Sequence, residues 1–151
     1  MPIATSRDIV DLSSENKTEE LAIKISKKLN SGDIVFLYGE IGVGKTTFVR
    51  YLINGLQKEK NLKLTEVTSP TFNLINEYEI NQTKINHYDL FRIKSIEDVK
   101  NLGIFDDNAN SITLIEWPQI IKEKPKNLIE LIFEYGIDHK KRYVKIKGSS
   151  L

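Results

Sequence analysis

The stretch FLYGEIGVGKTTFVRYL, residues 36–52, holds three of the chain's eight glycines within six consecutive positions. Glycine tolerates positive φ angles and lets other groups come close to the backbone, so such a cluster indicates a loop that wraps around a ligand. Residues 39–46, GEIGVGKT, match the pattern G-x-x-x-x-G-K-S/T at every fixed position. This spacing predicts a loop that binds nucleotide phosphates.

The residues on both sides supply the context that a phosphate loop requires. DIVFLY, residues 33–38, is typical of a buried strand, and an apolar stripe at helical spacing follows the loop. In such a unit the backbone N–H groups and the positive end of the helix face the phosphates, while Lys45 adds a charge and Thr46 offers a hydroxyl to Mg²⁺. We expect ATP or ADP with Mg²⁺, bound by Gly39, Glu40, Ile41, Gly42, Val43, Gly44, Lys45, Thr46 and Thr47.

Two further elements are predicted around this unit. Asn16 followed by Glu19 predicts a capped helix that ends at Gly32. After the loop, alternating residues on both sides of NQT, residues 81–83, predict an antiparallel hairpin. Guanine recognition usually needs an N-K-x-D sequence after the loop, and the nearest match here, residues 16–19, precedes it, so adenine is favoured.

The second half of the chain predicts one more helix and three more strands. Ser95 begins a short helix that Gly103 closes, and SITLIEW, residues 111–117, is typical of a buried strand. A final strand pair surrounds residues 136–141. We therefore expect an α/β protein with a P-loop NTPase fold, a mixed, largely parallel sheet and antiparallel hairpins, organised as a single domain over residues 1–151.

Two acidic residues end predicted strands downstream of the loop. Glu116 follows the apolar run at residues 112–115, and Asp89 follows residues 86–88. In P-loop proteins an acidic residue holds Mg²⁺, and a further group positions the attacking water. We expect Glu116 and Asp89 as catalytic residues, and Thr46 with Glu116 as metal ligands. The alternative for each acid is a solvated carboxylate at a strand end.

The overall composition excludes several kinds of function. The absence of cysteine excludes disulfides, thiolate metal sites and cysteine nucleophiles. A net charge of +1 is too balanced to predict nucleic-acid binding from charge alone. The N-terminal residues lack the pattern of a signal peptide, and no apolar run approaches the roughly 20 residues of a membrane span. We expect a cytoplasmic protein with no membrane contact.

Four motifs follow the phosphate loop in a recognisable order: SPTF at residues 69–72, HYDLFRI at 87–93, LGIFD at 102–106 and IEWP at 115–118. Together with the loop, they resemble the TsaE family over about residues 32–135. The resemblance implies a small bacterial ATPase required for the threonylcarbamoyl modification of tRNA adenosine 37. It further implies that the protein acts with the TsaD and TsaB proteins and meets tRNA only indirectly, through that complex.

The resemblance also implies roles for particular residues. Lys45 would hold the β and γ phosphates, Thr46 and Glu116 would ligate Mg²⁺, and Asp89 would order the metal or the attacking water.

Other residues would contribute at the margins of the site. Thr71 would belong to a nucleotide-sensing switch, and Trp117 would flank the site. Residues 15–18 and the basic turn of Lys140, Lys141 and Arg142 resemble, more loosely, contacts on the adenine side.

Two other interpretations remain open on the residues alone. A small-molecule kinase of the shikimate-kinase type closes an arginine-bearing lid over the phosphates, whereas Arg142 is expected here in a distal turn and Arg92 is the only plausible internal donor. A non-catalytic, nucleotide-gated adaptor needs the same binding residues as an ATPase. We expect His87 to be a strand residue with satisfied hydrogen bonds, because phosphoryl transfer does not require an imidazole at that position.

Overall fold

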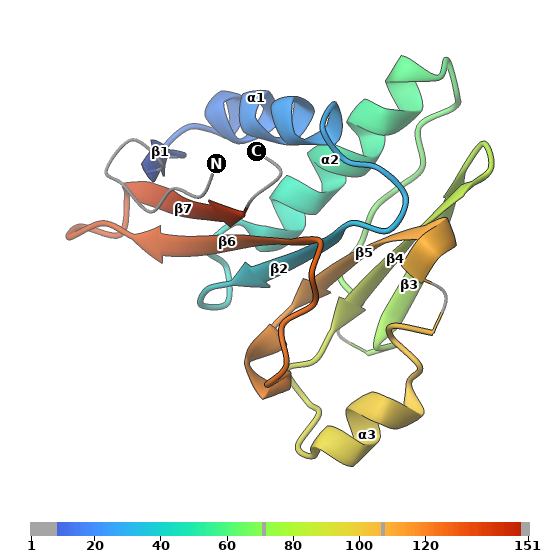
Figure 1. Cartoon of the computed structure of the whole chain (residues 1–151). Coiled ribbons are helices and arrows are strands. Elements are labelled where there is room, and N and C mark those ends of the chain that lie inside the picture. Colours follow the sequence, from blue (N-terminus) through green and yellow to red (C-terminus); the bar gives the residue numbers. More distant parts are fainter. Residues whose placement is uncertain (1–8, 71, 107, 149–151) are drawn as a thin grey trace.

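The computed structural model describes residues 9–70, 72–106 and 108–148. Its framework is a seven-stranded sheet in the order β1-β7-β6-β2-β5-β4-β3 (Figure 1). The strands are β1 (Ile9–Asp11), β2 (Ile34–Tyr38), β3 (Ile75–Ile80), β4 (Thr83–Asp89), β5 (Ser111–Glu116), β6 (Leu128–Tyr135) and β7 (Arg142–Gly148). The helices are α1 (Glu15–Ser26), α2 (Lys45–Glu59) and α3 (Ile96–Asn101), with the short 3-10 turns η2 (Asn108–Asn110) and η3 (Pro118–Ile120).

The centre of the sheet is parallel and its edges are antiparallel. Strands β6, β2, β5 and β4 run in one direction, whereas β7 pairs antiparallel with β6 and β1, and β3 pairs antiparallel with β4. β2 is buried along nearly its whole length, as its apolar sequence predicts for a parallel strand with both faces covered. The predicted α/β fold class, with a mixed, largely parallel sheet and antiparallel hairpins, is confirmed.

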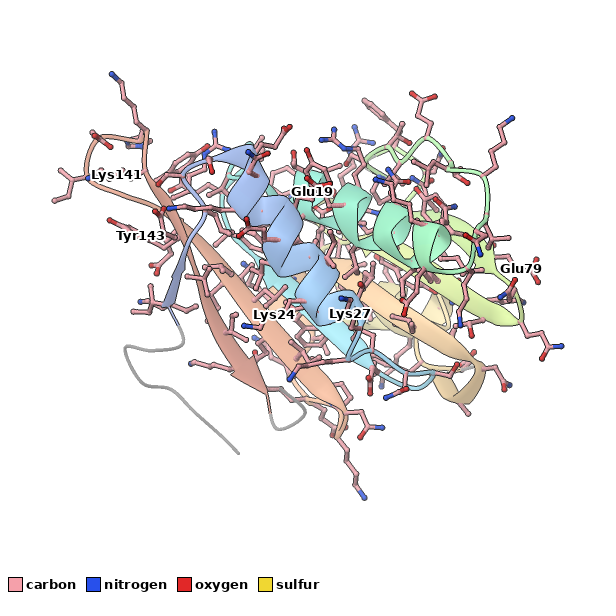
Figure 2. The ribbon with its side chains drawn as sticks, turned by 90° about the horizontal axis from the view of Figure 1, so that it is seen from above. Glu19, Lys24, Lys27, Glu79, Lys141 and Tyr143 are labelled. Carbon is pink, nitrogen blue, oxygen red and sulfur yellow. The ribbon has the colours of Figure 1, made fainter. Side chains whose placement is uncertain are left out.

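Helices cover both faces of the sheet. Figure 1 shows α1 and α2 over one face and α3 over the other, and Figure 2 shows α1 and α2 side by side, with Lys24 and Lys27 on the outer side of the layer. The inner stripe of α2 is fully buried and consists of Phe48, Val49, Leu52 and Ile53. A second apolar cluster fills the α3 side and includes Phe36, Tyr88, Val99, Ile104 and Ile115.

The hairpin and the α3 helix were predicted correctly. Strands β3 and β4 pair through Ile80 and Thr83, and the turn between them places Asn81 at a φ of 56°. The side chain of Ser95 accepts a hydrogen bond from the backbone N–H of Asp98 at 3.1 Å, which caps α3 at its N-terminus. Within the described part of the chain, no helix is long and apolar enough to cross a membrane.

The first helix differs from the prediction at both ends. Its N-cap is Ser14, in an extended conformation with its side chain accepting from the N–H of Lys17, so Asn16 lies inside the helix and does not cap it. The helix ends at Ser26, well before Gly32, because the chain then turns toward β2. The carboxylate of Asp33 accepts the N–H of Asn30 at 2.9 Å and stabilises that turn.

Candidate active site

The parallel register gathers the two predicted acids at one edge of the sheet. Glu116 of β5 lies opposite Leu37 of β2 on one side and opposite Asp89 of β4 on the other. Ligands of parallel α/β sheets bind beyond the carboxyl ends of the strands, which is where β2, β5 and β4 end here. A cavity of about 190 Å³ lies at this edge and is lined by Ile41, Gly42, Gly44, Lys45, Thr46, Thr47, Ser69, Asp89, Glu116, Trp117 and Arg142. We call it the phosphate-loop cavity.

The loop itself has a backbone that requires glycine. Gly42 and Gly44 have φ angles of 81° and 118°, in the region that side-chain-bearing residues avoid. A Cβ atom on Gly39 would lie 2.8 Å from a Val43 methyl carbon and 2.9 Å from the Phe133 carbonyl oxygen. Gly44 is the N-cap of α2 and provides no side-chain cap, so the first N–H groups of the helix remain available to an anion.

Lys45 is buried at the base of the cavity. Its side chain donates a hydrogen bond to the carbonyl of Gly39, and its Nζ lies 4.0 Å from the centre of the Trp117 ring. Burial lowers the pKa of Lys45, and the nearby carboxylates of Glu116 and Asp89 partly oppose that shift. Because burial makes a charged ammonium costly, a ligand with a compensating negative charge would stabilise the charged form of Lys45.

Thr46 and the two carboxylates form a cluster of oxygen donors. The Thr46 hydroxyl donates to Glu116 Oε2 at 3.3 Å, and His87 Nε2 lies 2.7 Å from the same oxygen. Asp89 Oδ1 accepts the N–H of Phe91 at 2.9 Å. Hydroxyl and carboxylate oxygens are the donors that Mg²⁺ prefers, and nucleotide phosphates commonly complete its coordination.

The cluster fits a metal that arrives with its nucleotide. Among the residues that the structure describes, no group of three or more His, Cys, Asp or Glu side chains is arranged to hold a metal ion. Thr46 and Glu116 would supply only part of an octahedral shell, so phosphate oxygens and water would supply the remainder.

Most of the predicted site residues come together in this cavity. Gly39, Glu40 and Val43 build the loop without lining the cavity; the Val43 N–H donates to the Glu40 carbonyl at 3.2 Å. Trp117 adopts a left-handed conformation with a φ of 57°, and its ring packs on Phe91 at 4.8 Å between centroids. Thr71 lies outside the described residues.

Lys140 lies on a second, neighbouring cavity. This cavity has a volume of about 420 Å³ and is lined by Leu12, Ser13, Ser14, Glu15, Thr18, Gly44, Thr47, His139, Lys140 and Arg142. It shares Gly44, Thr47 and Arg142 with the phosphate-loop cavity, so the two adjoin each other at the start of α2. The start of α1 and the turn before β7, which are far apart in sequence, therefore border one pocket beside the phosphate loop.

Arg142 lies closer to the phosphate loop than the distal turn expected from the sequence. It is the first residue of β7, it pairs with Tyr135 of β6, and its carbonyl accepts the N–H of Leu12 at 2.8 Å. This pairing brings its guanidinium over the Tyr135 ring, at 5.7 Å, and to the junction of the two cavities. Arg92, the arginine favoured from sequence, stacks on the Phe72 ring at 4.9 Å and does not line the phosphate-loop cavity.

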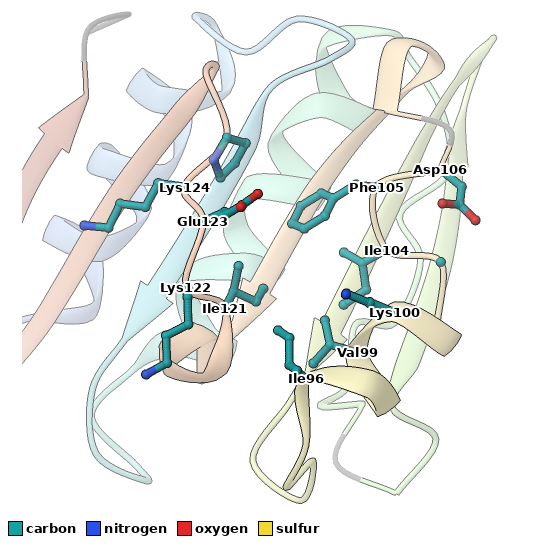
Figure 3. Close-up of a pocket in the computed structure, with 12 residues that line it drawn as sticks. Ile96, Val99, Lys100, Ile104, Phe105, Asp106, Ile121, Lys122, Glu123 and Lys124 are labelled. Atoms are coloured by element: carbon teal, nitrogen blue, oxygen red, sulfur yellow. The ribbon is translucent and has the colours of Figure 1, made fainter.

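A third cavity lies on the α3 side of the sheet. It has a volume of about 640 Å³ and is lined by Ile96, Val99, Lys100, Gly103, Ile104, Phe105, Asp106, Ile121, Lys122, Glu123, Lys124 and Pro125. Figure 3 shows the apolar side chains of Val99, Ile104 and Phe105 facing the segment that carries Ile121. We call it the α3 cavity; the phosphate loop contributes nothing to it.

The sequence comparisons with known proteins agree on one family. The sequence profile of the family "Threonylcarbamoyl adenosine biosynthesis protein TsaE" matches residues 12–144. The tRNA threonylcarbamoyladenosine biosynthesis protein TsaE of Rickettsia conorii is 40% identical over 136 residues, which cover 89% of this chain and 75% of that protein. The protein of the same name from Aquifex aeolicus is 38% identical over 138 residues, covering 91% of this chain and 93% of that one.

A solved structure shares the fold. The crystal structure of YdiB from Bacillus subtilis superposes with a TM-score of 0.72, covering 98% of this chain and 87% of that one, at 21% sequence identity. At this level of identity the similarity concerns the fold alone. The profile match and the curated relatives, in contrast, span nearly the whole chain, and they show that it belongs to the TsaE family of threonylcarbamoyl adenosine biosynthesis proteins.

Proposed function

We propose that this protein binds Mg-ATP in the phosphate-loop cavity and hydrolyses it slowly, in support of the threonylcarbamoylation of tRNA adenosine 37 by the TsaD and TsaB proteins. Membership of the TsaE family supports the role in tRNA modification. The ATPase activity rests on one observation, namely that Lys45, Thr46, Asp89 and Glu116 line a single cavity at the carboxyl ends of three strands.

Phosphate binding is the task of the loop and the start of α2. The left-handed glycines let successive N–H groups point at one anion, and the positive end of α2 faces the same point. Lys45 adds a full charge in a site where water screens it little, because only 4% of its surface is exposed. A triphosphate would therefore restore the pKa of Lys45, which burial lowers, toward its ordinary value.

Metal binding is the task of Thr46 and Glu116. These residues would hold Mg²⁺, which would supply positive charge to neutralise the transferring phosphate. The Thr46 hydroxyl donates a hydrogen bond to Glu116 Oε2, which leaves the lone pairs of the Thr46 oxygen for the metal. Asp89, adjacent to Glu116 in the sheet, orients the attacking water or a water bound to the metal.

The arginine content of the cavity supports slow hydrolysis by the isolated protein. Arg142 is the only arginine that lines it in the described part of the chain, and it lies at the junction with the second cavity. An arginine that stabilises the transferring phosphate contributes about 10³–10⁵ in rate. A partner that supplies or positions such a group would accelerate the reaction, and the exposed side chains of Ile41 and Phe91 offer it apolar surface nearby.

The second cavity is the place that we propose for the nucleoside. It adjoins the phosphate-loop cavity, and Glu15, Thr18 and Lys140 provide polar groups around it. No N-K-x-D sequence follows the loop, so we propose adenine as the base. TsaE family membership favours this ATPase over a small-molecule kinase.

Measurement of phosphate release tests the proposal directly. The protein would be assayed with Mg-ATP alone, with Mg-GTP, and with Mg-ATP in the presence of TsaD, TsaB and substrate tRNA. We expect slow release with ATP alone, less with GTP, and a clear increase with the complete set.

Three results would contradict the proposal in different ways. Turnover at tens per second by the isolated protein, with transfer of phosphate to a metabolite, would indicate a kinase. Tight ATP binding with no release under any condition would indicate a nucleotide-gated adaptor. A rate of ATP hydrolysis that stays the same when TsaD, TsaB and tRNA are added would indicate that the ATPase acts outside the modification pathway.

A further inference from the structure

His87 is a fully buried imidazole that contacts the carboxylate of Glu116. Its Nε2 lies 2.7 Å from Glu116 Oε2, with 0% of the His87 side chain and 4% of the Glu116 side chain exposed. An ionised carboxylate can only accept hydrogen bonds, so Nε2 must carry the hydrogen of this contact. His87 is thus a hydrogen-bond donor to the acid that we propose as a metal ligand.

The other ring nitrogen of His87 is Nδ1, and its burial is a cost to stability. Nδ1 is buried, and it has no hydrogen-bond partner within the described part of the chain. Of its two neighbouring positions in the sheet, Leu114 on β5 is apolar and Asn76 on β3 is polar, and Ile85, two residues earlier on β4, is apolar. An apolar side chain would fill this place without leaving a polar atom unpaired. The contact with Glu116 is therefore the physical reason for an imidazole here.

The two hydrogen bonds to Glu116 converge on one oxygen. Oε2 accepts from His87 Nε2 and also lies 3.3 Å from the Thr46 hydroxyl, which donates to it. With Oε2 held from β4 on one side and from the first turn of α2 on the other, the rotation of the carboxylate is fixed. Both of these hydrogen bonds fall on Oε2 and neither engages Oε1, and Glu116 lines the phosphate-loop cavity.

We propose that His87 is a positioning residue that fixes the Glu116 carboxylate, with Oε1 left for the metal or its water, and thereby sets the Mg²⁺ requirement of the site. The inference rests on the proposed function, because it concerns how the same cavity takes up Mg-ATP. Groups that orient a metal ligand from behind commonly change metal affinity or activity about 10–100-fold when they are removed.

A pair of amide substitutions tests the direction of the hydrogen bond. In His87→Gln the amide nitrogen reaches the region of Nε2 and keeps a donor to Glu116, whereas in His87→Asn the shorter side chain places it nearer Nδ1 and loses that donor. His87→Leu removes the donor entirely, and Ile85→Val is the matched control, since it alters the same face of β4 away from Glu116. Thermal unfolding would identify variants that fold.

The primary readout is the Mg²⁺ dependence of ATP affinity, measured by calorimetry, with turnover as a second readout. We expect His87→Asn and His87→Leu to need about tenfold more Mg²⁺ for half-maximal affinity, while the affinity for ATP without Mg²⁺ stays unchanged. His87→Gln and Ile85→Val should retain the wild-type dependence. In a Glu116→Ala background, His87→Asn should add no further loss, because its effect acts through that carboxylate.

Each outcome is decisive for one of the two proposals. If wild type binds Mg-ATP and His87→Asn retains the wild-type Mg²⁺ dependence, the positioning role is wrong and the proposed function stands. Equal losses in His87→Gln and His87→Asn, or a further loss of equal size in the Glu116→Ala background, would also overturn the positioning role. If wild type shows no Mg²⁺-dependent ATP binding, the proposed function fails and the role of His87 falls with it.

Discussion

The phosphate-loop cavity lies at the carboxyl ends of the central strands and the α3 cavity lies on the α3 side of the sheet, and the two differ in both size and lining. The α3 cavity is the larger, at about 640 Å³ against about 190 Å³, and its apolar residues form one wall of an ordinary core. The smaller cavity contains a buried lysine and two buried carboxylates, namely Lys45, Asp89 and Glu116. Charges removed from water are costly unless they are paired, so a group of them in one cavity indicates a charged ligand.

This contrast shows that the chemical character of the residues lining a cavity, and not the volume of the cavity, identifies the candidate functional site. Three charged residues of the α3 cavity, Lys122, Glu123 and Lys124, lie along the segment after η3, where Lys124 already pairs with Glu130 at 3.1 Å. Figure 3 shows Lys122 and Lys124 extending away from the α3 segment. Substitutions in the two cavities should therefore have very different effects on nucleotide binding and turnover.

The largest effect is expected on turnover, from Glu116→Ala and Asp89→Ala. Both residues are proposed to act on the metal and the attacking water, and groups that act in this way contribute about 10²–10⁴ in rate. Phosphate release at saturating Mg-ATP would measure the loss, with Glu123→Ala in the α3 cavity as the control. A variant that hydrolyses ATP at the wild-type rate would remove its residue from the mechanism.

The next effect is expected on affinity, from Lys45→Ala. A hydrogen bond to a charged group contributes about 1.5–3 kcal/mol, so affinity for ATP should fall roughly ten- to a hundred-fold. Trp117 is the only tryptophan and its ring lies 4.0 Å from Lys45 Nζ, so its fluorescence should report binding in the wild type.

Calorimetry would compare the affinities of Lys45→Ala and of Lys122→Ala, a lysine of the α3 cavity. Wild-type affinity in Lys45→Ala would contradict the assignment of the phosphate loop.

A smaller effect is expected from Arg142→Ala. Because the Arg142 side chain is only partly buried, its contact with a phosphate or ribose should resemble a solvent-screened pair of about 0.2–1 kcal/mol, a loss of up to about fivefold in affinity. Arg92→Ala, whose guanidinium stacks on Phe72, should bind ATP as wild type does. A larger loss of ATP affinity in Arg92→Ala than in Arg142→Ala would support the expectation from sequence, in which Arg92 is the internal arginine of the site.

The smallest effect is expected in the α3 cavity. The double variant Lys100→Ala with Lys122→Ala removes two of its cations without touching the phosphate loop. ATP affinity and turnover should both stay within about twofold of wild type, the scatter typical of surface substitutions. A loss of ATP binding in this variant, with binding retained in Lys45→Ala, would indicate that the nucleotide binds in the α3 cavity and not in the phosphate-loop cavity.

The phosphate loop could be predicted from sequence because its chemistry is local. Glycine spacing, the adjacent lysine and the flanking strand and helix lie within residues 33–59, and no long-range contact is needed to recognise them. The meeting of Asp89 and Glu116 at one edge could be predicted as well, since each ends a strand, and parallel strands end at a common edge.

The contacts that escaped prediction depend on how distant segments pair. Arg142 reaches the site because β7 folds back between β6 and β1, and the three-residue β1 is too short to leave a periodic pattern. The partner of His87 lies 29 residues away on β5, so the sequence could not show which acid the imidazole meets. The capping of α1 by Ser14 was missed because neighbouring residues of similar capping preference, Ser14 and Asn16, compete in sequence.

A crystal structure with Mg²⁺ and a non-hydrolysable ATP analogue would test the central claim most directly. We predict one nucleotide per chain, with its phosphates against the loop at residues 42–46, its metal beside Thr46 and Glu116, and its base toward Lys140. Nucleotide bound in the α3 cavity, or a phosphate loop that stays empty at millimolar ligand in solution and in the crystal, would contradict it.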